Sequence, residues 1–137
     1  MTTSGRKKKN GLTELQIERL HHLLLARRDQ LMENILQRSR NYPRIAEGQN
    51  TENFEQAAIN QRQAVTLRIL DKEAKLLERI EHALSKFGTG KYGLCEATNE
   101  PIGYPRLSIV PWARYCISYK EQREREQYTE SARLAGR

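Results

Sequence analysis

The sequence ENFEQAAINQRQAVTLRILDKEAKLLERIEHALSKF, residues 52–87, lies within the longest run of the chain that lacks glycine and proline. Its apolar residues recur three, four or seven positions apart, which predicts a helix with a broad buried face. They are Val65, Ile69, Leu76, Ile80 and Leu84, with Leu67, Leu70, Ala74 and Leu77 beside them. Such a helix is about 54 Å long at about 1.5 Å per residue. It needs a partner of similar length.

The segment just upstream, residues 12–40, repeats the same spacing and supplies that partner. Its apolar positions are Ile17, Leu20, Leu24, Leu31 and Ile35, and Thr13 is a suitable N-cap. Pro43 ends this helix, and residues 48–51 have turn and cap chemistry. The sequence therefore predicts a mostly α protein built on a long antiparallel coiled-coil hairpin, residues 12–87, with its tip near residues 43–57.

Composition limits what such a hairpin can do. The chain has 137 residues, a net charge of +7 and 37% hydrophobic residues, which is enough for one small domain but not for a fold that encloses a substrate. We therefore expect no enzymatic activity. There is no apolar run approaching the length of a membrane span, and there are only two cysteines. We expect a cytoplasmic protein with no membrane association.

The charge is distributed unevenly along the chain. Residues 1–11 form a basic segment with nothing to bury, so we expect a disordered tail there. Residues 44–58, at the expected tip, instead carry Arg44 against Glu47, Glu52 and Glu55, a net charge of −2. A basic protein is thus predicted to present an acidic hairpin tip.

After the hairpin, Gly88, Gly90 and Gly93 predict a compact segment of turns and short extended pieces that runs to about residue 113. Eight apolar and aromatic residues are available for its small core: Tyr92, Leu94, Ile102, Tyr104, Leu107, Ile109, Val110 and Trp112. A third, highly charged helix is expected over residues 113–134, with its later turns exposed.

The two cysteines stand where half of a zinc site would stand. Cys95 and Thr98, then Cys116 and Tyr119, have the spacing of two C-x2-C knuckles about twenty residues apart, with the second ligand of each knuckle replaced. No histidine lies in this segment, and structural zinc takes four Cys or His ligands. We therefore expect a knuckle without metal and no cofactor.

The hairpin, the knuckle and the closing charged helix together resemble the DksA/TraR family of bacterial transcription regulators. The likeness covers residues 12 to about 127 and is carried by residues 52–58, 77–81, 91–95, 102–103, 106–107, 115–116 and Lys120. It implies four segments: a tail at residues 1–11, the hairpin at 12–87, a degenerate zinc-finger-like knuckle at 88–119, and a charged C-terminal helix and tail at 120–137.

The resemblance also implies a function. Members of the family bind RNA polymerase rather than DNA and insert the hairpin into the secondary channel, so that its tip approaches the catalytic centre and alters open-complex lifetime. By this likeness, Glu52, Glu55 and Ala57 form the active tip. Arg79 and Lys120 match basic positions that contact the alarmone ppGpp, a regulator of the stringent response. Missing ligands at Thr98 and Tyr119 match zinc-less members, in which packing around Leu94, Trp112 and Tyr115 replaces the metal.

The chain departs from the family pattern at two functional positions. The family tip reads Asp-x-x-Asp-x-Ala, whereas Glu52 and Glu55 here carry each carboxylate about 1.5 Å farther out. Val110 replaces a basic residue before Pro111. Two other classes stay open: a coiled-coil adaptor, which would explain the hairpin but not its acidic tip, and a degenerate zinc-ribbon nucleic-acid binder, which needs the ligands that are absent.

Overall fold

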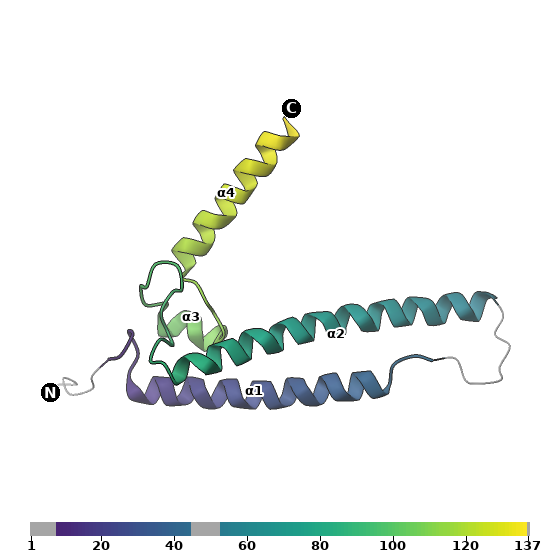
Figure 1. Cartoon of the computed structure of the whole chain (residues 1–137), viewed down its shortest axis with the longest axis horizontal. Coiled ribbons are helices and arrows are strands. Elements are labelled where there is room, and N and C mark those ends of the chain that lie inside the picture. The colour runs from purple at the N-terminus through teal and green to yellow at the C-terminus, as the bar shows by residue number, and fades with distance from the viewer. Residues whose placement is uncertain (1–7, 45–52, 137) are drawn as a thin grey trace. The chain divides into compact units, whose positions relative to one another are not determined.

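The fold is that of a computed structural model, which describes residues 8–44 and 53–136. Four helices occur in these ranges: α1 (Glu14–Arg40), α2 (Asn53–Phe87), α3 (Tyr104–Ile109) and α4 (Ile117–Ala135). No strand forms there, and α1 and α2 run antiparallel as the two arms of a hairpin (Figure 1). The predicted class, a mostly α chain with a long coiled-coil hairpin, is confirmed. Within the described residues, no helix is long and apolar enough to span a membrane.

The chain divides into two compact units, and α1 and α2 each contribute to both. One unit, Ala26–Glu81, contains the arms of the hairpin toward its tip. The other combines Met1–Leu25 with His82–Arg137, and so contains the base of the hairpin, the knuckle and α4. We call these the arm unit and the base unit.

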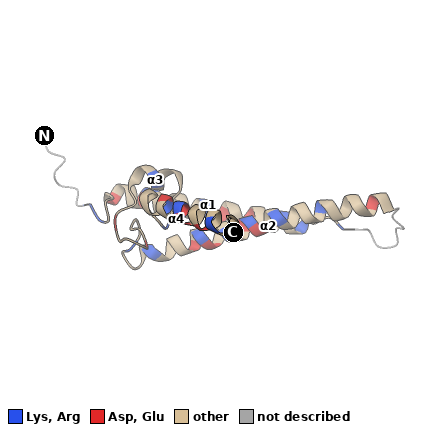
Figure 2. Cartoon of the chain, turned by 90° about the horizontal axis from the view of Figure 1, so that it is seen from above, with Lys and Arg blue, Asp and Glu red and all other residues tan. Residues whose placement is uncertain are grey.

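In the described residues of the arm unit, the two helices have only each other to pack against. Leu31 and Ile80 are buried, but Val65 and Leu67 are 44% and 54% exposed. The expectation of a broad buried face along all of α2 is therefore wrong near the tip, because a single partner helix covers only one stripe. Lys, Arg, Asp and Glu occupy many of the remaining surface positions (Figure 2).

One ion pair crosses between the helices of the arm unit. The Arg38 guanidinium donates through Nε to Glu73 Oε1 at 3.0 Å, and a second guanidinium nitrogen lies 3.0 Å from the same oxygen. The Glu73 side chain is only 14% exposed. A shift in helix register would leave this carboxylate without its cation, so the pair favours one alignment of the two arms.

The base unit holds most of the buried side chains. Those less than 8% exposed are Leu12, Leu20, Leu24, Ala83, Tyr92, Cys95, Leu107 and Cys116. An aromatic stack joins the helices to the knuckle: the Phe87 ring lies 4.6 Å from that of His21 and 4.0 Å from that of Tyr92. The Tyr92 hydroxyl then donates to the Pro111 carbonyl at 2.8 Å. The base of the hairpin and the knuckle therefore share one core.

The chain before α1 also belongs to this core. Asn10 donates through its side-chain amide to the carbonyls of Gly90 and Tyr92, both at 2.8 Å. Thr13 caps α1 as expected, in a reciprocal capping box with Gln16. The expectation of a disordered tail through residue 11 is therefore wrong for residues 8–11, although residues 1–7 lie outside the described part. The turn-forming pair Asn10–Gly11 is the sequence feature that could have predicted an ordered segment here.

Two further expectations need correction. The knuckle was expected to hold only turns and extended pieces, but α3 forms because Pro105, in its first turn, has a backbone already suited to helix. Ile109 was expected in the core, yet it is 78% exposed because this short helix buries only Leu107.

The last helix begins later than residue 113 because its expected first residues are held in another conformation. The Arg114 carbonyl accepts the Glu96 amide at 2.9 Å, and the Tyr115 carbonyl accepts Arg106 Nε at 3.2 Å. Cys116 is extended and serves as the N-cap of α4, none of whose residues is buried. The expectation that its later turns are exposed is confirmed.

Leu12 tests whether the residues before α1 belong to the core. Leu12→Ala should lower the free energy of unfolding by about 2–4 kcal/mol, because its side chain is 0% exposed and would leave a cavity against Gly93. Leu15→Ala is the matched control, since Leu15 is 53% exposed, and should cost less than about 1 kcal/mol. Urea unfolding followed by circular dichroism measures both. Equal losses would show that Leu12 is not a core residue.

Candidate functional site

The hairpin tip is the first candidate site, and the described part of it begins at Asn53. Glu52 lies outside the described residues. Glu55 lies in the first turn of α2, and both Glu55 and Ala57 are exposed. The Glu55 side chain has no hydrogen bond or ion pair with any residue of the described chain, and Phe54 beside it is 84% exposed. The carboxylate is favourably placed on the helix N-terminus and is open to a partner.

The basic residues matched to alarmone contacts are also open to solvent. Arg79 lies on α2 in the arm unit, and Lys120 lies in the first turn of α4 in the base unit; both are exposed. Val110, at the end of α3, is half-buried. Exposure is compatible with a binding role for the two cations but does not by itself assign one.

The knuckle brings the two cysteines into one hydrogen-bonded cluster. Thr98 Oγ1 lies 3.9 Å from Cys116 Sγ, which also lies 3.3 Å from Ser118 Oγ. Burial by itself raises the pKa of the Cys95 thiol, but hydrogen bonds from the Thr98 hydroxyl and from backbone amides, that of Cys116 among them, outweigh burial and lower it to about 7. The Thr98 hydroxyl therefore contacts the Cys116 sulfur and helps to lower the pKa of the Cys95 thiol.

These residues do not fit a structural zinc ion. Both thiols are present, but the Thr98 hydroxyl is hydrogen-bonded and the Tyr119 ring packs 5.1 Å from that of Tyr115. Residues 8–44 and 53–136 contain no group of three or more His, Cys, Asp or Glu side chains placed to hold a metal. A closed tetrahedral zinc site takes four Cys or His ligands, so this donor set supplies only half of one.

Packing accounts for only part of what holds the knuckle. Leu94, Trp112 and Tyr115, which the family likeness implied as replacements for the metal, are half-buried. The sulfur-bearing residues are buried more deeply, at 0% and 7% exposure for Cys95 and Cys116. Thr98 and Ser118 add hydrogen bonds to the Cys116 sulfur. A role for Ser118 was not predicted, although it follows Cys116 by only two residues.

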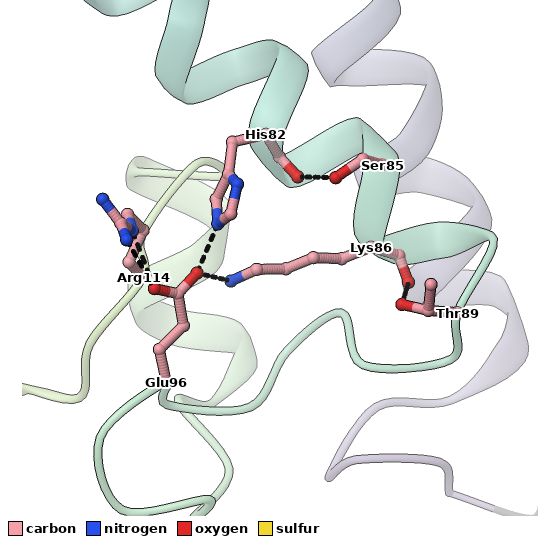
Figure 3. Close-up of polar contacts among 6 residues, drawn as sticks. All are labelled: His82, Ser85, Lys86, Thr89, Glu96 and Arg114. Carbon is pink, nitrogen blue, oxygen red and sulfur yellow. Dashed lines mark hydrogen bonds and ion pairs between the residues drawn. The ribbon is translucent and has the colours of Figure 1, made fainter.

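A cluster of charged residues beside the knuckle was missed altogether by the sequence analysis. The Glu96 carboxylate accepts hydrogen bonds from His82 Nε2, from Lys86 Nζ at 2.7 Å, and from two guanidinium nitrogens of Arg114 at 2.8 Å (Figure 3). We call these four residues the Glu96 cluster. Burial opposes ionisation of Glu96, but the hydrogen bonds from Arg114, Lys86 and His82 outweigh burial and lower its pKa to about 2.

Residue spacing in the sequence could have predicted only half of this cluster. His82 and Lys86 are four residues apart and therefore share a face at the end of α2. Glu96 and Arg114 come from loops, where residue spacing does not predict which side chains meet.

Known proteins share both the knuckle and the hairpin of this chain. The prokaryotic dksA/traR C4-type zinc finger family matches residues 90–126. The RNA polymerase-binding transcription factor DksA of Salmonella typhimurium is 30% identical over 109 residues, 80% of this chain and 72% of the relative. The protein of that name from Caulobacter vibrioides is 41% identical over 64 residues, 47% of this chain and only 45% of the relative. The structure of transcription factor DksA2 from Pseudomonas aeruginosa matches with a TM-score of 0.73 and 34% identity, over 84% of this chain and 88% of that one.

The incomplete set of zinc ligands predicts a low zinc content. The purified protein should contain much less than one zinc ion per chain, and a chelator should leave its helicity unchanged, because two thiols supply only half of the ligands of a closed structural zinc site. Elemental analysis and circular dichroism before and after chelation measure this. One tightly held zinc per chain, lost together with helicity, would contradict it.

Proposed function

The chain belongs to the DksA/TraR family, and we propose that it is a transcription regulator that binds RNA polymerase through the secondary channel and brings its acidic hairpin tip close to the catalytic centre. The observation that carries the proposal is the likeness to an RNA polymerase-binding transcription factor over 80% of this chain. The relatives are named as transcription factors, which supports a regulatory rather than an enzymatic role.

The chemistry of the tip supports this mechanism. Glu55 is an exposed carboxylate without a partner in the described chain, at the end of a helix whose next charged residue is Arg62. Carboxylates are ligands that Mg²⁺ prefers, and a polymerase catalytic centre depends on bound Mg²⁺. A tip that carries Glu52 and Glu55 can therefore act on the metal or on the mobile elements around it without itself performing a reaction.

The tip residues are proposed to act on transcription more than on affinity. Glu52→Gln combined with Glu55→Gln should still be retained by core RNA polymerase but should fail to shift open-complex lifetime, because the change removes charge while keeping size. Stability should fall by less than about 1 kcal/mol for each residue, the usual contribution of a carboxylate at a helix N-terminus. Ala57→Thr should also reduce regulation, through added bulk at a close contact.

Two control variants separate the tip from the rest of α2. Glu78→Gln with Glu81→Gln removes the same charge from exposed positions of the same helix, and Ala64→Thr adds the same bulk at an exposed alanine. Both should regulate normally. If the Gln tip variant regulates a ribosomal RNA promoter as well as the parent, the secondary-channel mechanism is wrong for this chain even though the protein binds polymerase. If the parent is not retained by core polymerase, a coiled-coil adaptor role is favoured instead.

Alarmone contact is the finer part of the proposal, and it rests on Arg79 and Lys120. A guanidinium offers a planar fork to phosphate oxygens and an ammonium offers a point charge, so Arg79→Ala with Lys120→Ala should abolish the response to ppGpp while polymerase retention persists. Transcription assays with and without ppGpp measure this, and Arg68→Ala with Arg123→Ala, also exposed, is the control. An unchanged ppGpp response in the first variant would reject the assignment.

A further inference from the structure

The Glu96 cluster joins three parts of the base unit through one carboxylate. His82 and Lys86 come from the last turns of α2, Glu96 follows Cys95 in the first half of the knuckle, and Arg114 lies in the second half, two residues before Cys116 (Figure 3). A backbone hydrogen bond at 2.9 Å, from the Glu96 amide to the Arg114 carbonyl, runs alongside the side-chain contact. Glu96 and Arg114 are therefore connected twice.

The partial burial of the Glu96 cluster strengthens its ion pairs. The Lys86 and Glu96 side chains are only 12% and 23% exposed, whereas His82 and Arg114 are each 45% exposed. Ion pairs on an open surface contribute little because water competes for both partners. Here the Glu96 side chain is partly shielded from water and its carboxylate accepts charge-assisted hydrogen bonds on both of its oxygens, which are stronger than neutral ones.

A structural zinc ion would hold the two halves of a C4-type finger together, and the donor set of this knuckle cannot bind one in a closed site. The link between the two halves must then come from other contacts. We propose that Glu96 is the positioning residue that replaces the metal in this respect. It clamps the second half of the knuckle to the first through Arg114, and it fixes both halves on the end of α2 through Lys86 and His82.

What Glu96 positions is the start of α4. Arg114 is held on the carboxylate, and Cys116, two residues later, is the N-cap of that helix. The direction in which α4 leaves the knuckle, and with it the place of Lys120 in its first turn, is set at this point. For regulation of polymerase, this consequence rests on the proposed function; for the seating of the knuckle, it does not.

The two buried thiols report directly on whether the knuckle is seated. Cys95 and Cys116 are 0% and 7% exposed, so a disulfide reagent such as dithionitrobenzoate reaches them only when the knuckle opens. Glu96→Gln should speed their modification by about tenfold or more, because it removes the charge from several hydrogen bonds at once. The helicity of the chain should change little, since most of it comes from α1, α2 and α4. Glu100→Gln, an exposed glutamate four residues away in the same segment, should leave the rate unchanged.

A double-mutant cycle separates positioning from a general loss of stability. Arg114→Gln should also speed thiol modification, and combining it with Glu96→Gln should add less than the product of the two single effects, because both remove the same link. Lys91→Gln is a cation control from the start of the knuckle, exposed and outside the cluster; its effect should multiply fully with that of Glu96→Gln. Should Glu96→Gln lose its helicity, Arg114→Gln alone decides, since it leaves Glu96 paired with Lys86 and His82.

The outcomes are distinct. Accelerated thiol modification in Glu96→Gln and in Arg114→Gln, with effects that do not multiply, supports the proposal. Rates equal to that of Glu100→Gln, or effects that multiply fully, overturn it.

A transcription assay then tests whether the seating of the knuckle matters for regulation of polymerase. Accelerated modification with unchanged regulation by Glu96→Gln would overturn the link to α4 and polymerase alone. A parent protein that does not bind polymerase would instead reject the proposed function and leave the thiol result standing.

Discussion

A hairpin of two helices offers each apolar stripe only one partner, and this constraint governs where the protein is stable and where it is available to others. Toward the tip, Val65 and Leu67 are 44% and 54% exposed because no third element of the described chain covers them. At the base, the knuckle and the residues before α1 supply that third layer, and Leu12, Leu20 and Leu24 are buried there. Burial is concentrated in the base unit, so the tip can carry exposed side chains that are available to a partner.

The base layer in turn needs something to hold the knuckle, which is too small to provide much apolar burial of its own. In a C4-type finger a metal does this, but here the Cys116 sulfur contacts the hydroxyl groups of Thr98 and Ser118, and Glu96 binds Lys86 and Arg114, from two segments, through one carboxylate. Hydrogen bonds and ion pairs are weaker than zinc coordination. Because several of them act on the same short segment, their effects combine.

The elements with long, regular patterns were predictable from sequence. The apolar spacing around Leu20 and Ile80 indicated the two long helices, and Thr13 indicated the start of the first within one residue. Spacing could not predict the contacts between loops, such as Glu96 with Arg114 or Asn10 with the Tyr92 carbonyl. It also could not predict α3, because a proline favours the start of a helix as well as a turn. Such contacts depend on how the chain folds back on itself, which a local pattern does not encode. Of the tip, the structure describes Glu55 and Ala57 but not Glu52, so the functional grouping of these residues stays a prediction.

The central claim, that the hairpin tip works inside the polymerase, can be tested by where the tip lies in the complex. A photocrosslinking amino acid in place of Phe54, which is 84% exposed beside Glu55, should attach to polymerase residues that line the secondary channel near the catalytic centre. The same amino acid in place of Tyr128, 78% exposed on α4, should not reach them. Crosslinks from position 54 to the outer surface of the enzyme, or none at all from a chain that core polymerase retains, would contradict the account.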